Sequence, residues 1–461
     1  MAALSKEHHL STPEPSRPPA AKPFGLWSGA GLVVANMVGA GVFLSTGFMA
    51  QSLGPAHILL AWVLGAVLAL CGAVAYAEVA RLVPHSGGEY RYLSTLLHPS
   101  LGYLAGWASL LVGFSAPIAL DAVAAGAFAR AVSDAFEPRV VGAGLIVLLT
   151  ALHAFRLRVS SRAQNALVTV KVLLLAAFVA VAVVKGRVAW PTWTPPQPGP
   201  SPWSDLVGSL FFIAFAFSGW NAAVYAADEF KQPGRDVPRA MLLGCLAVGA
   251  LYLVVNYLFV ANLTPEQGTV VFHYDDFAAL KGQYEQVTLG QAVMGALLGP
   301  AAARVMSGVM VLLFVSAMSA MMLVGPRVYA AMAADGYLPR ALAAKEGTPP
   351  VGAIVLQGGL ALALLATHDV RTVLSNVGAI LVLFAALTVA GLFRAFLTAK
   401  TPEAKPRPAS LLAAAVYVLS SGWMLYTGFS RTPALLGWVA GVAVAALVAF
   451  QATRTLSRRS A

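Results

Sequence analysis

The chain has 461 residues, of which 59% are hydrophobic and only 11% are charged, and its mean hydropathy is +0.76. Soluble domains carry about 25% charged residues, so this composition excludes a soluble protein. The formal net charge of +11 does not indicate nucleic-acid binding, because basic residues of membrane proteins gather in cytoplasmic loops. Both cysteines lie inside apolar runs, so we expect no disulfide framework, no metal site and no cofactor.

Three parts of the chain differ in composition. Residues 1–23 are polar and Pro-rich and lack the apolar centre of a signal peptide, which predicts a disordered cytoplasmic tail. Residues 24–400 hold ten apolar runs and form the expected transport core, and residues 401–461 hold two more runs and a basic cytoplasmic C-terminus. Runs of about 20 apolar residues can cross a bilayer as helices. We therefore expect an all-α integral membrane protein with twelve transmembrane helices.

The expected spans, in chain order, are 26–53, 55–82, 101–129, 139–155, 164–184, 205–229, 240–262, 304–333, 350–367, 372–397, 409–428 and 433–452. If the N-terminus lies inside, the inner segments hold most of the 30 Lys and Arg residues. Cytoplasmic loops of membrane proteins are enriched in these residues. The pattern predicts a multi-pass protein of the plasma (inner) membrane, embedded in the lipid bilayer, with both termini in the cytoplasm.

The first apolar run is interrupted near its middle by Gly39 and Gly41. Glycine is about 1 kcal/mol worse than alanine inside a helix, and backbone groups freed within a membrane need other partners. The freed N–H groups would be those of Ala40, Gly41 and Val42, and the freed carbonyls those of Met37 and Val38. The first set suits an anion and the second a cation, so the pair suits a zwitterion such as an amino acid. The alternative is a small-residue face for close helix packing.

The sixth apolar run carries Ser218, Gly219 and Asn221 at its centre. An Asn at membrane depth marks a functional site more often than not. Breaks in the first and sixth spans are five helices apart, which is the spacing of two inverted five-helix repeats with a binding site between them. The paired breaks therefore favour a binding site over close packing.

Residues 24 to about 400 resemble the amino acid–polyamine–organocation superfamily of permeases. The motifs are Gly-Ala-Gly-Val-Phe at 39–43, Ser-Gly-Gly-Glu-Tyr at 86–90, Phe215 to Asn221, and Asp228 to Ala240. The last two are most similar to the L-type amino acid transporter branch. The resemblance implies the LeuT fold, with twelve transmembrane helices, a 5+5 inverted repeat, and discontinuous first and sixth helices.

The resemblance also implies roles for single residues. The backbone N–H groups of Ala40 and Gly41 would bind the substrate carboxylate. The carbonyl of Met37 would bind the substrate ammonium, together with the carbonyls of Phe215 and Ser218, and the Phe215 ring would close over the substrate. The full expected substrate site is Met37, Ala40, Gly41, Val42, Phe215, Ser218, Gly219 and Asn221.

Lys171 lies inside the fifth apolar run, nearer to its inner end. A lysine there costs several kcal/mol unless it snorkels to the cytoplasm, pairs or loses its proton. The resemblance implies that its ammonium occupies the place that a sodium ion fills in sodium-coupled carriers of this fold. The groups that it would contact are the carbonyls near Val38 and Gly39 and a hydroxyl of Ser316 or Ser319. The expected mechanism is therefore independent of sodium.

Asp121 lies in the third run, one turn after Pro117. Three roles stay open for its carboxylate: carrying a proton, contacting a cationic substrate side chain, or capping backbone freed by Pro117. Four other acidic residues are expected to be structural or to form an inner gate, Glu78 and Glu89 with Arg81 and Arg91, and Asp228 and Glu229 with Arg235 or Arg239.

These features predict a secondary transporter of neutral L-amino acids that works by alternating access without sodium. Proton-coupled symport, and exchange of cationic amino acids or polyamines, stay open as alternatives. An enzyme is not expected, because no nucleophiles, acids or metal ligands converge at one depth. Eukaryotic members of the branch pair with a heavy chain through a cysteine after span three. Residues 132–137 hold no cysteine, so a stand-alone, bacterial-type member without a disulfide-linked heavy chain is expected.

Overall fold

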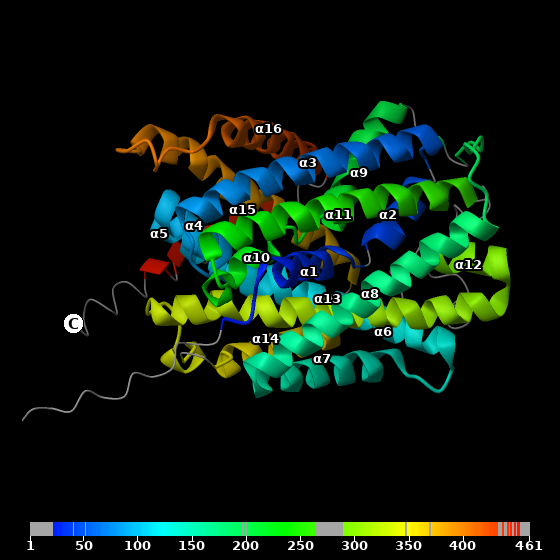
Figure 1. Ribbon diagram of the computed structural model, residues 1–461, viewed down its shortest axis with the longest axis horizontal. Helices are drawn as coiled ribbons and strands as arrows, with labels where there is room; N and C mark the ends of the chain where they lie inside the picture. The colour runs from blue at the N-terminus through cyan, green and yellow to red at the C-terminus, as the bar shows by residue number, and fades with distance from the viewer. Residues whose placement is uncertain are drawn as a thin grey trace, which may run out of the picture.

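The structure is a computed structural model, and it is an all-helical bundle. It describes residues 22–39, 41–50, 52–195, 198, 201–262, 289–345, 348–367, 370–431, 436–437, 440–441, 443–444, 447–448 and 450–451. Most helices run along one common direction, with α1 and α2 in the middle of the bundle (Figure 1).

The first half of the chain forms α1 (Leu26–Met37), α2 (Gly41–Met49), α3 (Pro55–Leu82), α4 (Gly88–Leu96), α5 (Pro99–Ala108), the π-helix η1 (Ser109–Ser115), α6 (Ala116–Val132), α7 (Pro138–Phe155) and α8 (Leu157–Lys185). The second half forms α9 (Pro202–Ala216), α10 (Ala222–Tyr225), the 3₁₀ turn η2 (Ala227–Glu229), α11 (Pro233–Asn262), α12 (Leu289–Leu298), α13 (Pro300–Ala334), the 3₁₀ turn η4 (Arg340–Leu342), α14 (Val351–Thr367), α15 (Val370–Thr398) and α16 (Pro408–Arg431).

Among the described residues, eight helical segments are long and apolar enough to cross a membrane, and the bent pair α1–α2 makes a ninth. α9 has 15 residues and α14 has 17, which is short for a span of about 20 residues. The last expected span, 433–452, lies largely outside the described residues. The all-helical, multi-pass class is therefore confirmed, and the number of twelve spans stays a prediction.

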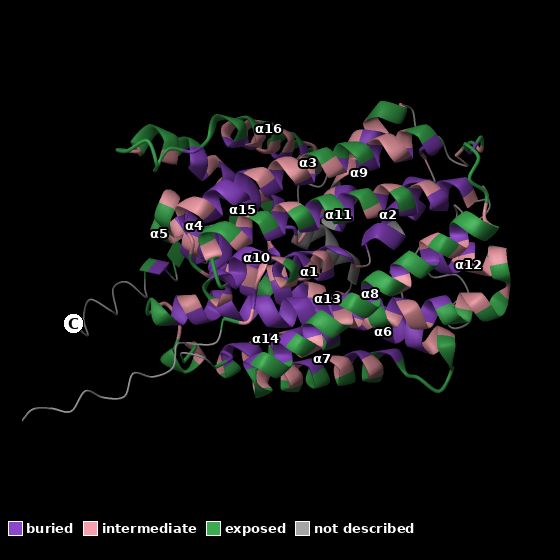
Figure 2. Cartoon of the chain, viewed as in Figure 1, coloured by how far each residue is buried: buried purple, intermediate pink, exposed green. Residues whose placement is uncertain are grey.

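The helices differ in how much of their surface the protein covers. In its most apolar stretch α13 is 72% buried, whereas α7 and α8 are 28% buried and α16 is 22% buried. Figure 2 shows the same contrast, with buried residues concentrated on α1 and α13 and exposed residues along α7 and α8. A helix that exposes so many apolar residues is typical of one that faces lipid, so α13 belongs to the core and the others to its rim.

The first span is broken where its glycines predicted. α1 ends at Met37, α2 begins at Gly41, and the two axes bend by 49°. A Cβ atom added to Gly41 would lie only 2.5 Å from the Cα of Ala216. Because no side chain fits there, glycine is what allows the start of α2 to touch the end of α9.

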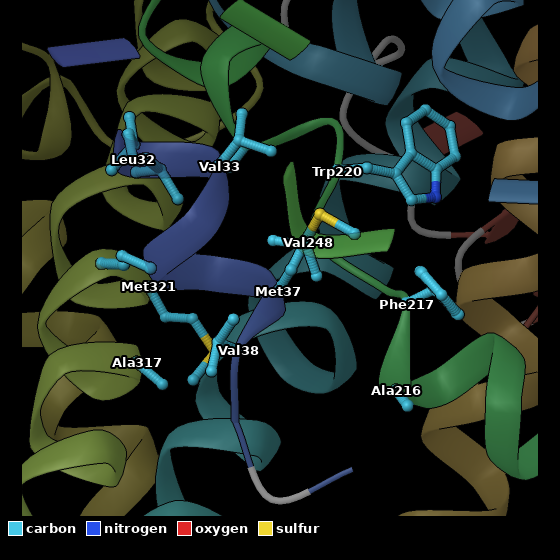
Figure 3. Packing of buried hydrophobic residues seen from close by; sticks show 14 of the residues in the cluster. Leu32, Val33, Met37, Val38, Ala216, Phe217, Trp220, Val248, Ala317 and Met321 are labelled. Carbon is cyan, nitrogen blue, oxygen red and sulfur yellow. The ribbon is translucent and has the colours of Figure 1, made fainter. Parts of the chain in front are cut away.

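The sixth span is broken at the predicted place as well. α9 ends at Ala216, a turn follows, and α10 begins at Ala222. Gly219 in this turn has a φ of +96°, and a Cβ there would lie 2.9 Å from Oδ1 of Asn36. Only glycine adopts this backbone at no steric cost, and its small size lets the two breaks touch. Figure 3 shows Met37 at the end of α1, between α13 and α9.

The third span contains a feature that the sequence did not predict. Between α5 and α6 the helix widens into the π-helix Ser109–Ser115, and Pro117 follows directly. In a regular α-helix the ring of Pro117 would clash with the carbonyl of Gly113, so a widened turn before it is the expected response. Such π segments are frequent at functional sites.

Ion pairs close one end of the bundle, which we call the basic end. They join Arg327 to Glu229 at 2.6 Å and Arg91 to Asp335 at 3.0 Å, and the His85 ring lies 3.5 Å from the Asp228 carboxylate. The backbones of Phe24 and Phe230 also pair there, so the start of α1 is tied to the end of the second break. The expected pairing of Asp228 and Glu229 with Arg235 or Arg239 is wrong, because Glu229 pairs with Arg327 of α13 and Asp228 contacts His85 and Ser86 in the loop between α3 and α4.

Replacing Gly41 with leucine should abolish substrate binding while the protein still folds. The added side chain would push α2 away from Ala216 and displace the N–H groups at the start of α2. Binding of radiolabelled amino acid to purified, monodisperse protein measures the effect. Gly47→Ala on the same helix is the control, because its Cβ would meet Leu289 at an ordinary 3.7 Å. Wild-type affinity in Gly41→Leu would contradict the role of this break.

Candidate functional site

A cavity of about 160 Å³ lies where the two broken spans meet. Its wall includes Asn36, Met37, Gly39 and Gly41 from the first break, and Ala216, Phe217, Ser218, Gly219, Trp220 and Asn221 from the second. Parts of α3, α4, α5, η1, α6, α9, α10, α13, α15 and α16 complete it. A cavity of about 150 Å³ is large enough for benzene, so this one suits a single small molecule.

The hydroxyl of Tyr252, from α11, joins the two breaks. Its oxygen lies 2.7 Å from the carbonyl oxygen of Met37 and 3.1 Å from that of Ala216. These carbonyls end α1 and α9, and the last carbonyls of a helix lack partners within it. A hydroxyl has one proton to donate, so the two acceptors share it. One buried side chain thus holds the two half-helix ends together.

A chain of buried hydrogen bonds supports Tyr252 from behind. Trp62 of α3 donates its indole N–H to Thr46 of α2 at 2.7 Å, and the Thr46 hydroxyl donates to Asn256 of α11 at 2.5 Å. The amide of Asn256 then donates to the backbone carbonyl of Tyr252 at 2.8 Å. The rings of Trp62 and Tyr252 also meet edge to face, with centroids 5.5 Å apart. These hydrogen bonds fix α2 relative to α3 and α11.

Sequence reasoning missed Tyr252, Asn256 and Thr46. The available signal was a Tyr and an Asn four residues apart in the seventh apolar run, since residues at that spacing lie on one helix face. Polar side chains inside a membrane span are costly unless they have partners, which also marks this pair.

Lys171 of α8 is almost fully buried, with 1% of its surface exposed. Its ammonium donates to the carbonyl of Ala35 at 3.0 Å and to that of Val38 at 2.5 Å. Both carbonyls belong to the last turn of α1, where the helix dipole places partial negative charge. In this conformation the side chain reaches α1 rather than the membrane surface, so the snorkelling alternative does not describe it.

Neither Ser316 nor Ser319 bonds to Lys171 in the structure. The hydroxyl of Ser319 instead donates to Gln164 at 2.5 Å and contacts His153 at 2.8 Å. The hydroxyl of Ser316 is buried, and it has no hydrogen-bond partner among the described residues. The expectation of a serine hydroxyl at the ammonium is therefore not met in this conformation, because Ser319 belongs to a separate polar cluster between α7, α8 and α13.

Asp121 of α6 lies in the cavity wall and is 9% exposed. Among the described residues it forms no ion pair with Lys171. In the same part of the chain it makes no hydrogen bond to backbone near Pro117, so the capping role finds no support. A proton site and a contact for a substrate cation stay open.

Glu89, at the start of α4, is the second carboxylate in the cavity wall. It is buried and accepts hydrogen bonds from the Tyr76 hydroxyl at 2.9 Å and the Asn221 amide at 2.7 Å. The predicted pairing with Arg91 is wrong, because Arg91 bonds to Asp335 instead. Glu78 and Arg81 do pair, at 2.8 Å.

The predicted site residues divide into three groups. Those in the cavity wall are Met37, Gly39, Gly41, Ser218, Gly219, Asn221 and Asp121. Those buried behind it are Val38, Val42, Lys171, Ser316 and Ser319. Two lie wholly or partly outside the described residues, Ala40 and the side chain of Phe215. The roles that sequence analysis assigned to them stay predictions.

A multi-pass bundle with two broken helices that meet at a small cavity defines a class of protein, the membrane transporters built on discontinuous helices. Residues 24–450 match the family described as amino acid permease. Because this match covers most of the chain, the protein belongs to that family.

Several named amino acid transporters are similar to most of the chain. It is 28% identical to the large neutral amino acids transporter small subunit 2 of Rattus norvegicus, over 90% of this chain and 78% of the relative. It is 25% identical to the Asc-type amino acid transporter 1 of Mus musculus, over 90% and 78% of the two chains. It is also 25% identical to the b(0,+)-type amino acid transporter 1 of Mus musculus, over 90% and 84%.

Removing the hydroxyl of Tyr252 with Tyr252→Phe should lower both stability and transport. Two buried carbonyls would lose their shared donor, which costs about 1–3 kcal/mol. Thermal unfolding in detergent and amino acid uptake in proteoliposomes measure the two effects. Tyr257→Phe is the matched control. Tyr257 lies on the same helix as Tyr252, but its hydroxyl donates to the backbone carbonyl of Val188, which is an exposed residue. Equal effects of the two variants would argue against a special role for Tyr252.

Proposed function

We propose that this permease carries neutral L-amino acids across the membrane by alternating access, without using sodium. The observation that carries the proposal is that both broken helices present backbone groups at one small cavity, while Lys171 already supplies a cation to the carbonyl end of α1. A sodium ion held by those carbonyls would have to displace this ammonium. The names of the relatives support amino acids as the substrate class, and large neutral ones in particular.

The substrate backbone would bind between the half-helices. Its carboxylate would accept hydrogen bonds from the first N–H groups of α2, which start at Gly41. Its ammonium would lie near the carbonyl ends of α1 and α9, although the Met37 carbonyl also accepts from Tyr252. A carbonyl oxygen has two lone pairs, so both donors can be accommodated.

The wall of the cavity carries a second candidate function. Asp121 and Glu89 are both acidic, and no Lys or Arg side chain lies among the described residues of the wall. This favours exchange of cationic amino acids as the alternative, and one relative carries the b(0,+) name. Proton-coupled symport is a further alternative, because either carboxylate could take up a proton.

The finer architecture that we propose has twelve spans in the LeuT arrangement, with a 5+5 inverted repeat. Three spans would be added to the nine that the described helices allow. The first is α9 together with α10, the second is α14, and the third is residues 433–452. The basic end would face the cytoplasm together with both termini, because Lys and Arg favour that side. The closed ion pairs would then form the inner gate of the plasma membrane carrier.

We also propose that the chain acts alone. Residues 132–137, between α6 and α7, contain no cysteine for a disulfide to a heavy chain. The two cysteines, Cys71 and Cys245, lie within α3 and α11.

Uptake of a radiolabelled neutral amino acid into proteoliposomes should be unchanged when choline replaces sodium. The reason is that the Lys171 ammonium already satisfies the carbonyls of Ala35 and Val38. Initial rates at two pH values separate exchange from proton symport. Competition by each of the twenty amino acids separates neutral from cationic substrates. A strong sodium requirement would overturn this mechanism.

Lys171→Ala should lose most transport while the protein still inserts and folds, because the end of α1 loses its cation. Lys171→Arg should also fail, since a planar guanidinium cannot replace a compact ammonium in a closed site. Uptake by purified protein measures both, and size-exclusion chromatography checks the fold. Lys185→Arg, at the exposed end of the same helix, is the control. Near-wild-type uptake by Lys171→Arg would reject the proposed role.

A further inference from the structure

The backbone before Glu89 directs this residue into the cavity wall. Gly87 and Gly88 have positive φ values of 117° and 52°, which glycine adopts without strain. A Cβ on Gly88 would lie 2.2 Å from the ring of Tyr225, so the start of α4 packs directly on α10. The chain thereby places a carboxylate beside the second break, whereas Arg91, two residues further on, pairs with Asp335.

The carboxylate of Glu89 has hydrogen-bond donors but no counter-ion among the described residues. Its Oε1 accepts from Tyr76 and from Asn221, and its Oε2 is buried without a hydrogen-bond partner among the described residues. In the same part of the chain, no Lys, Arg or His forms an ion pair with it. A buried carboxylate without a cation is costly, and a purely structural acceptor could be supplied by a neutral group. Its presence therefore calls for a functional reason.

Asn221 supplies that reason through the orientation of its amide. Its Nδ2 donates to Oε1 of Glu89 at 2.7 Å and to the hydroxyl of Tyr225 at 3.0 Å. An amide nitrogen has two hydrogens, so both are used. The Oδ1 atom is left over, and it has no hydrogen-bond partner within the described residues. Because Asn221 lines the cavity, the group that it offers to a ligand is an acceptor.

Only Glu89 can impose this orientation. A Tyr hydroxyl both donates and accepts, so Tyr225 alone would tolerate either orientation of the amide. The Oε1 atom of Glu89 accepts from the Tyr76 hydroxyl as well, so it acts as an acceptor and requires the NH₂ side of Asn221 to face it. Without Glu89 the amide could turn over and present its donor to the cavity instead.

We infer that Glu89 is a positioning residue that fixes Asn221 with Oδ1 toward the substrate, so that the carrier prefers neutral amino acids whose side chains donate a hydrogen bond. This inference rests on the proposed function, because it names the substrate class of the same cavity. A buried acceptor that meets no donor loses a hydrogen bond, so a substrate side chain with only acceptors is disfavoured.

Two isomeric substrates test the inference. Homoserine carries a hydroxyl donor, whereas O-methylserine has the same atoms and a similar size but only an ether acceptor. The ratio of their kcat/KM values is measured in proteoliposomes, so that differences in expression and reconstitution cancel. Norvaline, an apolar side chain of similar length, reports whether transport itself works.

In the wild-type protein, kcat/KM should be about fivefold higher for homoserine than for O-methylserine, which corresponds to the free energy of one ordinary hydrogen bond. Glu89→Met, which removes the acceptor at similar volume, should bring the ratio to within about twofold of one. Glu89→Gln, which is nearly the same shape, should lie between, because its amide can donate or accept. Glu78→Met is the matched control: Glu78 is equally buried but lies outside the cavity wall, so the ratio should stay at the wild-type value.

A wild-type ratio of one, with norvaline taken up normally, would overturn the inference and leave the proposed function intact. An unchanged ratio in both Glu89 variants would overturn it as well. If the wild-type protein takes up none of the three compounds and no other neutral amino acid, the proposed function itself fails.

Discussion

The constraint on which this structure depends is that backbone groups freed inside a membrane cannot turn to water. Two helices are broken at the centre of the bundle, and their ends find partners on other helices. Tyr252 serves the carbonyls of Met37 and Ala216, and Lys171 serves those of Ala35 and Val38. The breaks therefore persist only because α8 and α11 carry donors at matching depths.

This arrangement treats the two kinds of helix end differently. The carbonyl end of α1 is occupied by groups of the protein itself, an ammonium and a hydroxyl. The N-terminal end of α2 lies next to the cavity, and the glycine there brings it against α9. Lys171 therefore occupies the carbonyls of Ala35 and Val38, whereas the N–H groups at the start of α2 are the ones that we propose for the substrate carboxylate.

Two ion pairs between helices lie at one end of the bundle. There Arg327 and Glu229 join α13 to the end of the second break, and Arg91 joins α4 to the end of α13. The Arg91–Asp335 pair is about one-third exposed and therefore weak, whereas Arg327 and Glu229 are only 7% and 20% exposed, so breaking that pair costs more free energy. Glu89 is the exception, because it lies inside the wall of the cavity and has only uncharged hydrogen-bond partners.

The sequence by itself determined the membrane class and both helix breaks, and it singled out Lys171 as a charge inside a span, because hydropathy, glycine at mid-span and a lone charge in an apolar run are local signals. Only the tertiary structure decided which groups meet at the breaks. Tyr252 looked like an ordinary apolar-run residue, and Glu89 looked like a loop partner of Arg91. The physical reason is that a hydrogen bond between distant helices depends on how the helices pack and rotate against each other. The spacing of residues along one helix does not predict either.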